Sequence, residues 1–187
     1  MIITYFGDGC FRLQSGDTTL LVDPNSNRLK ADVVLKTLVP ANVAAAPATE
    51  FAFPGEYESK GMTIIGSPVA TESTEKFLKN VFVVEWEEMT FAFLGHLSRM
   101  AEPDIIERIG EPDILFFPFD GKHFLSADGA AKLIKQIGPR VVIPSFGKNP
   151  DEVMKALGQK TDIQDKFVFK KKDLEGKQSK LVVLKSG

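Results

Sequence analysis

Few side chains in this sequence are suited to holding a metal ion or moving a proton. The 187 residues include two histidines, His96 and His123, and one cysteine, Cys10. A dinuclear zinc site takes several imidazoles and a bridging carboxylate, because neutral nitrogen donors suit zinc and its neighbours. The sequence therefore lacks the histidines that a conventional dinuclear hydrolase would need.

Composition places the chain among soluble globular proteins, with 43% hydrophobic and 26% charged residues. The net charge of −2 gives no general attraction for nucleic acid, so we expect no nucleic-acid partner. No segment approaches the roughly 20 apolar residues of a membrane-spanning helix, which predicts no membrane partner. Residues 1–7 lack the features of a signal peptide, and a single cysteine fits a reducing compartment. We therefore expect a cytoplasmic protein.

The helices and strands that must position these residues are predicted from hydrophobic periodicity and from the Gly, Pro and Asp residues that mark turns between them. The length predicts a single domain over residues 1–187. Helices are predicted over residues 104–109, from Ser126 to the Gly138-Pro139 stop, and over residues 151–157 before Gly158. A terminal hairpin is expected to join residues 167–169 with 181–184. Strands are predicted over residues 2–6, 11–14, 18–22, 31–36, 61–66, 81–85, 90–94, 113–117 and 141–143.

Residues 3–11 read ITYFGDGCF, and residues 19–24 read TLLVDP. Together they resemble the opening of the metallo-β-lactamase-fold hydrolases, in the branch that includes L-ascorbate-6-phosphate lactonase. Further matching segments follow in the same order along nearly the whole chain, at residues 31–37, 54–58, 60–61, 93–97, 112–115 and 141–144. The resemblance implies an α/β fold of the four-layer αββα sandwich type, with two mixed sheets and helices outside.

The same resemblance implies that the metal ligands have been replaced. Active relatives carry T-H-x-H-x-D-H where this chain has residues 37–43, TLVPANV. A later H-L-G-D segment corresponds to residues 93–96, and the last ligand strand, I-P-[ML]-H, to residues 143–146. Leucine, proline, valine and phenylalanine side chains offer no lone pair to a metal. The former ligand positions are thus occupied by Leu38, Pro40, Asn42, Val43, Phe93, His96 and Phe146.

Three polar residues remain near the inferred site. Asp8 stands at the usual first histidine, Asp23 at a position that orients ligands in relatives, and His96 at the bridging aspartate. One interpretation is a rewired site that holds one metal or acts as an acid–base pair. The simpler one, which we favour, is that Asp8 and Asp23 cap turns by bonding to local backbone N–H groups. His123 lies in a loop that relatives place near the active-site mouth, and is a weaker binding candidate.

The sequence therefore predicts a degenerate metallo-β-lactamase-like protein without metal-dependent hydrolysis. We expect it to bind an unidentified small molecule or protein partner in a retained pocket, with Phe93 and Phe146 filling the former metal cavity, and with no cofactor. The alternative is a hydrolase of a phosphorylated or lactone-type small molecule, which would use zinc or manganese in a site around Asp8, Asp23 and His96. Homo-oligomerisation is compatible with either interpretation.

Overall fold

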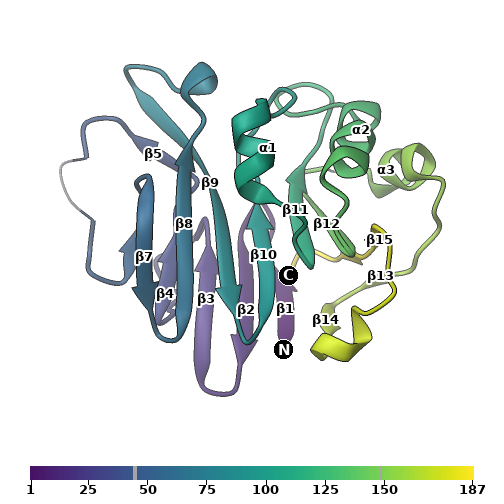
Figure 1. Ribbon diagram of the computed structural model, residues 1–187, viewed down its shortest axis with the longest axis horizontal. Helices are drawn as coiled ribbons and strands as arrows, with labels where there is room; N and C mark the ends of the chain where they lie inside the picture. Colours follow the sequence, from purple (N-terminus) through teal and green to yellow (C-terminus); the bar gives the residue numbers. More distant parts are fainter. Residues whose placement is uncertain (44–45, 148) are drawn as a thin grey trace.

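The computed structural model describes residues 1–43, 46–147 and 149–187, and it places two β-sheets face to face (Figure 1). This mixed α/β architecture confirms the predicted fold class. In the residues that it describes, no helix is long and apolar enough to cross a membrane.

The first sheet is built mainly from the N-terminal meander. Its strand order is β14-β1-β2-β3-β4-β6, in which β3 pairs parallel with β4 and Val22 lies opposite Leu35. The ends of β3 and β4 therefore meet at one edge of the sheet. The strands are β1 (Ile2–Tyr5), β2 (Phe11–Ser15), β3 (Thr18–Val22), β4 (Val33–Leu35), β6 (Glu50–Phe51) and β14 (Lys166–Val168).

The second sheet has eight strands, in the order β15-β12-β11-β10-β9-β8-β7, with β5 paired to β9 off this path. β10 to β12 run parallel to one another, because a helical segment connects each to the next. The strands are β5 (Leu38–Pro40), β7 (Gly55–Ser59), β8 (Met62–Pro68), β9 (Phe77–Trp86), β10 (Met89–Phe93), β11 (Ile114–Pro118), β12 (Val141–Ser145) and β15 (Lys180–Leu181).

Three α-helices pack on the outer face of the second sheet: α1 (Pro103–Ile109), α2 (Ala127–Ile137) and α3 (Pro150–Leu157). Their ends follow the predicted signals. The Ser126 hydroxyl accepts a hydrogen bond from the Gly129 N–H at the start of α2, and Gly138 ends that helix in a left-handed conformation. Short 3-10 helices lie at Ala70–Glu72 and Lys171–Asp173.

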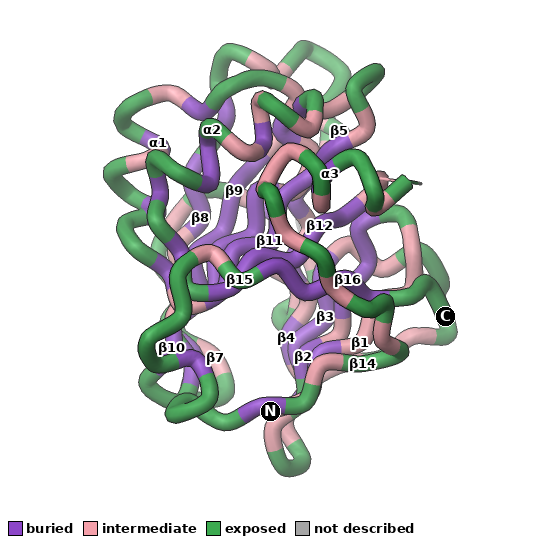
Figure 2. Tube along the Cα trace, turned by 90° about the vertical axis from the view of Figure 1, so that its right-hand side faces the viewer, coloured by how far each residue is buried: buried purple, intermediate pink, exposed green. Residues whose placement is uncertain are grey.

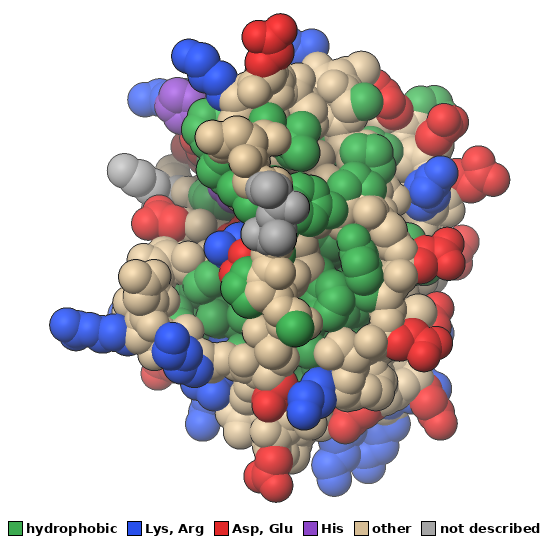
Figure 3. Space-filling model, turned by 90° about the vertical axis from the view of Figure 1, so that its left-hand side faces the viewer, with side chains coloured by type: hydrophobic (Ala, Val, Ile, Leu, Met, Phe, Trp, Pro, Cys, Tyr) green, Lys and Arg blue, Asp and Glu red, His purple; other side chains and the backbone are tan. Residues whose placement is uncertain are grey.

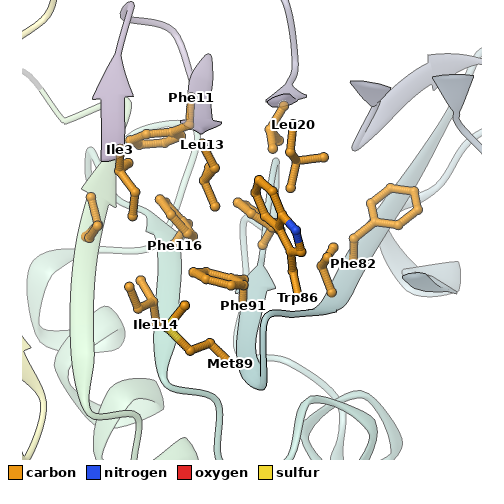
Figure 4. Packing of buried hydrophobic residues seen from close by; sticks show 14 of the residues in the cluster. Ile3, Phe11, Leu13, Leu20, Phe82, Trp86, Met89, Phe91, Ile114 and Phe116 are labelled. Carbon is orange, nitrogen blue, oxygen red and sulfur yellow. The ribbon is translucent and has the colours of Figure 1, made fainter. Parts of the chain in front are cut away.

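The main core lies between the two sheets. Alternate residues of each strand point into it, and Figure 4 shows Phe11 and Leu13 of β2 facing Phe91 of β10 and Phe116 of β11. A second cluster joins the helices to the other face of the eight-stranded sheet. Figure 2 shows the result as buried strands at the centre and exposed loops outside.

The predicted terminal hairpin is wrong. β14 pairs antiparallel with β1, so that Ile3 lies opposite Phe167. Residues 180–181 form β15 beside β12, while β16 (Val183–Leu184) pairs parallel with β13 (Ile163–Gln164). β1 supplies the partner of β14, because the 3-10 helix at Lys171–Asp173 and the following turn separate β14 from residues 180–184.

Candidate functional site

A hydrogen-bonded chain links Asp23, Thr37 and His96. The Thr37 hydroxyl and backbone N–H donate to the two carboxylate oxygens of Asp23, the N–H at 2.7 Å. The Thr37 Oγ1 atom lies 2.9 Å from Nδ1 of His96, and that nitrogen is 3.8 Å from Asp23 Oδ2. A hydroxyl has a single hydrogen, so when it is given to the Asp23 carboxylate, Nδ1–H of the imidazole must be the donor to Oγ1. The Nε2 atom of His96 then keeps its lone pair.

Strand ends bring these residues together. Asp23 directly follows β3, and Thr37 lies two residues beyond β4, its parallel neighbour. His96 comes from the second sheet, three residues beyond the end of β10. Gly95 before it has φ of 53°, and a Cβ at that position would collide with the Thr37 side chain. A glycine is therefore needed for the two sheets to approach at this point.

Burial shifts the pKa values of the two ionisable side chains in this hydrogen-bonded chain, Asp23 and His96. The side chains of His96 and Asp23 are 19% and 10% exposed. Burial raises the pKa of Asp23 to about 6, against the opposing effect of the Thr37 hydrogen bonds and of Lys36. Burial, and secondarily the positive charge of Lys79, lowers the pKa of His96 to about 4. At neutral pH the pair is thus a carboxylate and a neutral imidazole.

A cavity of about 370 Å³ adjoins this chain of residues, and Asp8, Asp23 and His96 all line it. The three candidate residues therefore converge. Asp8 itself is exposed, in the tight Gly7-Asp8-Gly9 loop closed by the Phe6 N–H donating to Cys10 O at 2.8 Å. Asp23 bonds to Thr37, 14 residues along the chain, so the expectation that it caps its own turn is wrong.

Three of the four former ligand positions in residues 37–43 line the same cavity, namely Leu38, Pro40 and Val43. Leu38 and Pro40 belong to β5, whose backbone is held by pairing with β9. Asn42 is exposed in the following turn. Figure 3 views the side of the molecule that carries β5 and β7, and on it hydrophobic side chains gather at the centre while charged ones stand mostly around the rim.

Phe146 occupies the space beside His96. Its ring lies 4.9 Å from the His96 ring and stacks on Phe124 at 4.3 Å between centroids. On its other side it covers Gly9 so closely that a Cβ there would collide with it. Its backbone has φ of 64°, and its N–H donates to the Tyr5 hydroxyl at 3.1 Å. Phe146 thus fills volume between the opening loop and the imidazole.

Phe93 and His123 lie elsewhere. Phe93 is 1% exposed and stacks on Phe116 at 4.5 Å, so its ring packs in the core between the sheets and not at the cavity beside His96. His123 is exposed, and its backbone N–H donates to Asp120 Oδ1 in a turn. It lines a separate hollow beside Phe146 and Glu152.

The donors around the cavity do not fit a dinuclear metal centre. Within residues 1–43, 46–147 and 149–187, no three His, Cys, Asp or Glu side chains are grouped so that they could hold a metal ion. Both oxygens of Asp23 and Nδ1 of His96 are also engaged with Thr37. What the arrangement offers is a set of hydrogen-bond acceptors beside apolar walls.

Comparison with known proteins places this geometry in a family. The model of the beta-lactamase superfamily domain matches residues 2–145. The chain belongs to this superfamily. Among curated proteins, none matches the chain significantly.

Solved structures support the metallo-β-lactamase fold over the full length. A Thermotoga maritima protein described as a Zn-dependent hydrolase of the metallo-β-lactamase superfamily has a TM-score of 0.76 and 24% identity, covering 98% of this chain and 97% of that one. The metallo hydrolase Igni18 from Ignicoccus hospitalis has a TM-score of 0.67 and 16% identity, covering 90% of this chain and 99% of that one. The metallo-β-lactamase fold protein YhfI from Bacillus subtilis has a TM-score of 0.67 and 14% identity, covering 100% of this chain and 97% of that one.

Sequence reasoning missed two residues of the site. Thr37 is completely buried and joins Asp23 to His96, but a threonine after a strand carries no signal of such a role. Phe124 stacks on Phe146 from the loop before α2. Its neighbour His123 drew attention in the sequence, whereas the ring that reaches the site is that of Phe124.

Proposed function

We propose that this superfamily member does not carry out metal-dependent hydrolysis and binds a small molecule in the cavity lined by Asp8, Asp23 and His96. The observation that carries the proposal is the position of Phe146, whose ring packs between Gly9 and His96. An apolar ring beside the one imidazole of the cavity removes the room and the donor that a second metal-binding histidine would supply.

The acid–base properties of the pair favour binding over hydrolysis. A general base works best when its pKa is close to the working pH. The pKa of His96 is lowered to about 4 by burial, which makes the imidazole a weak base at neutral pH. The pKa of Asp23, about 6, is closer to neutral pH, but both of its carboxylate oxygens already accept hydrogen bonds from Thr37. These groups are better suited to accepting hydrogen bonds from a ligand than to activating water.

Elemental analysis tests the proposal. The purified protein is incubated with zinc or manganese, loose metal is removed, and the metal content per chain is measured together with hydrolysis of lactone and phosphoester substrates. We expect a stoichiometry near zero and no turnover. The matched variants are His96→Ala in the cavity and His123→Ala in the exposed loop.

About one tightly held metal per chain, lost in His96→Ala and retained in His123→Ala, would overturn the proposal if it came with turnover. That outcome would favour the alternative, a hydrolase with a rewired site around Asp8, Asp23 and His96. Metal retained in His96→Ala and lost in His123→Ala would indicate adventitious binding to the exposed histidine and would leave the binding proposal standing.

A further inference from the structure

The cavity beside His96 carries an excess of negative charge. Its charged lining consists of three carboxylates, Asp8, Asp23 and Glu50, and one ammonium group, Lys36. Lys36 and Glu50 neutralise each other in an ion pair of 2.8 Å. His96 is neutral because burial lowers the pKa of its imidazole. Two uncompensated carboxylates therefore remain, so an anionic ligand would be repelled and a cation attracted.

The polar atoms of the cavity are mostly acceptors. The Lys36 ammonium is paired with Glu50, and the Asn25 side-chain amide donates to Phe6 O at 3.1 Å. Both oxygens of the Asp23 carboxylate keep a further lone pair beyond the bonds from Thr37, and the Nε2 atom of neutral His96 keeps its own. A ligand that satisfies these atoms must bring N–H donors.

A buried amide behind the cavity has an acceptor that no described residue satisfies. Asn80 is 1% exposed, and its Nδ2 donates to the carbonyl of Ala52, which lines the cavity. Its backbone N–H donates to Thr37 O, so the residue lies directly behind the site. Among the described residues its Oδ1 has no hydrogen-bond partner. Buried acceptors of this kind are normally satisfied, so this oxygen is a further acceptor near the site without a donor from the described residues.

The remaining walls are apolar. Leu38, Pro40, Val43 and Ala52 line the cavity, and its volume of about 370 Å³ lies at the lower end of the range for small-molecule sites, roughly 300–1,000 Å³. A primary ammonium group has three N–H donors and a positive charge, and an attached hydrocarbon would contact these walls.

We propose that the ligand of this cavity is a small primary alkylammonium ion, whose ammonium group binds the Asp23 carboxylate and His96 and whose hydrocarbon packs on the apolar wall. This inference rests on the proposed binding function and names its ligand class. It also separates this chain from hydrolysis of phosphorylated substrates, since a phosphate would meet the same carboxylates.

The test uses n-butylammonium as the probe, with n-butanol as the neutral isostere and butyrate as the anionic one. Each is titrated into ¹⁵N-labelled full-length protein at pH 8, and amide shifts of Thr37, Leu38 and His96 are followed by NMR. We expect saturable shifts with n-butylammonium alone. Asp23→Asn should weaken binding about tenfold or more, since a hydrogen bond between charged groups is lost. Glu56→Gln, on the exposed edge of β7, should leave binding unchanged.

Butyrate or n-butanol binding as tightly as n-butylammonium, or more tightly, would overturn the ligand class. So would amide shifts that do not saturate with n-butylammonium and are the same in Asp23→Asn. Neither result would contradict the proposal of a metal-free binding protein. Failure of the proposed function itself would be seen separately, as tightly held metal with turnover. Should Asp23→Asn fold poorly, Asp8→Asn gives the second test. Asp8 is exposed and has φ of 48°, a conformation that Asn tolerates equally, and weaker binding in this variant is expected.

Discussion

The contribution of the buried Asp23 side chain to native stability should fall as pH rises, and Asp23→Asn should remove that pH dependence. The pKa of Asp23 is raised by burial from its ordinary value of 3.8 to about 6. Between these pH values the folded protein keeps the proton while the unfolded chain has released it, so native stability is lost as pH rises through 6. A difference of about two pKa units corresponds to about 3 kcal/mol.

His96 acts in the opposite direction over nearly the same range. Its pKa is lowered from 6.5 to about 4, so the unfolded chain binds the proton first and stability is lost as pH falls below 6.5. This shift also corresponds to about 3 kcal/mol. In the native protein the two contributions should nearly cancel between pH 4 and 6. In Asp23→Asn only the His96 contribution remains, so stability should rise by about 3 kcal/mol from pH 4 to 6.5.

The measurement is urea unfolding at pH 4 to 8, followed by the fluorescence of Trp86, the single and buried tryptophan. Asn resembles the protonated aspartic acid, so the variant and native protein should be about equally stable at pH 4, and the variant about 3 kcal/mol more stable at pH 8. The control is Asp17→Asn in the exposed turn before β3, at the opposite end of that strand from Asp23. A stability difference that stays constant from pH 4 to 8 would refute the argument.

Two further substitutions test the packing around the site. Thr37→Val should lower the free energy of unfolding by about 1–3 kcal/mol, because it leaves Asp23 and His96 without the hydroxyl between them. Thr37→Ser keeps the hydroxyl and should keep most of the stability. Equal losses of stability in the two variants, measured by urea unfolding, would count against the hydrogen-bonded chain. Gly9→Ala should cost about 2–5 kcal/mol through its φ of 80° and its collision with the Phe146 ring. In a Phe146→Ala background the loss of stability caused by Gly9→Ala should fall to about 1–2 kcal/mol, because only the backbone strain remains. If the loss is undiminished in this double-mutant cycle, the Phe146 ring does not press on Gly9.

Local sequence signals predicted most of the elements. The alternation in β2, the continuous apolar run of β3 and the Ser126 and Gly138 signals of α2 act over a few residues, and the structure follows them. β5 was missed because a three-residue segment containing a proline is stabilised only by its pairing with β9. The partner of β14 was also non-local, since β1 lies more than 160 residues earlier in the chain, about the whole length of the fold.

The site was predictable in position more than in detail. The resemblance to the metallo-β-lactamase fold indicated that Asp8, Asp23 and His96 belong to one region, and they line one cavity. The contact between Asp23 and His96 depends on Thr37, which is buried where the ends of β4 and β10 approach. Contacts between the ends of strands in different sheets leave no periodic trace in the sequence, so this hydrogen-bonded chain could be seen only in three dimensions.

The pairing of β5 with β9 has a consequence for any attempt to introduce metal ligands into this chain. Leu38 and Pro40 occupy positions that the family resemblance assigns to metal ligands, yet their backbone is now fixed as an edge strand, with Val39 opposite Leu78. Introducing histidines there one at a time would place polar rings on an extended segment without forming a loop that presents them together. Each single substitution would therefore lose apolar contact before any metal could bind. A metal site at this position would need several simultaneous substitutions and a different backbone between β4 and β6.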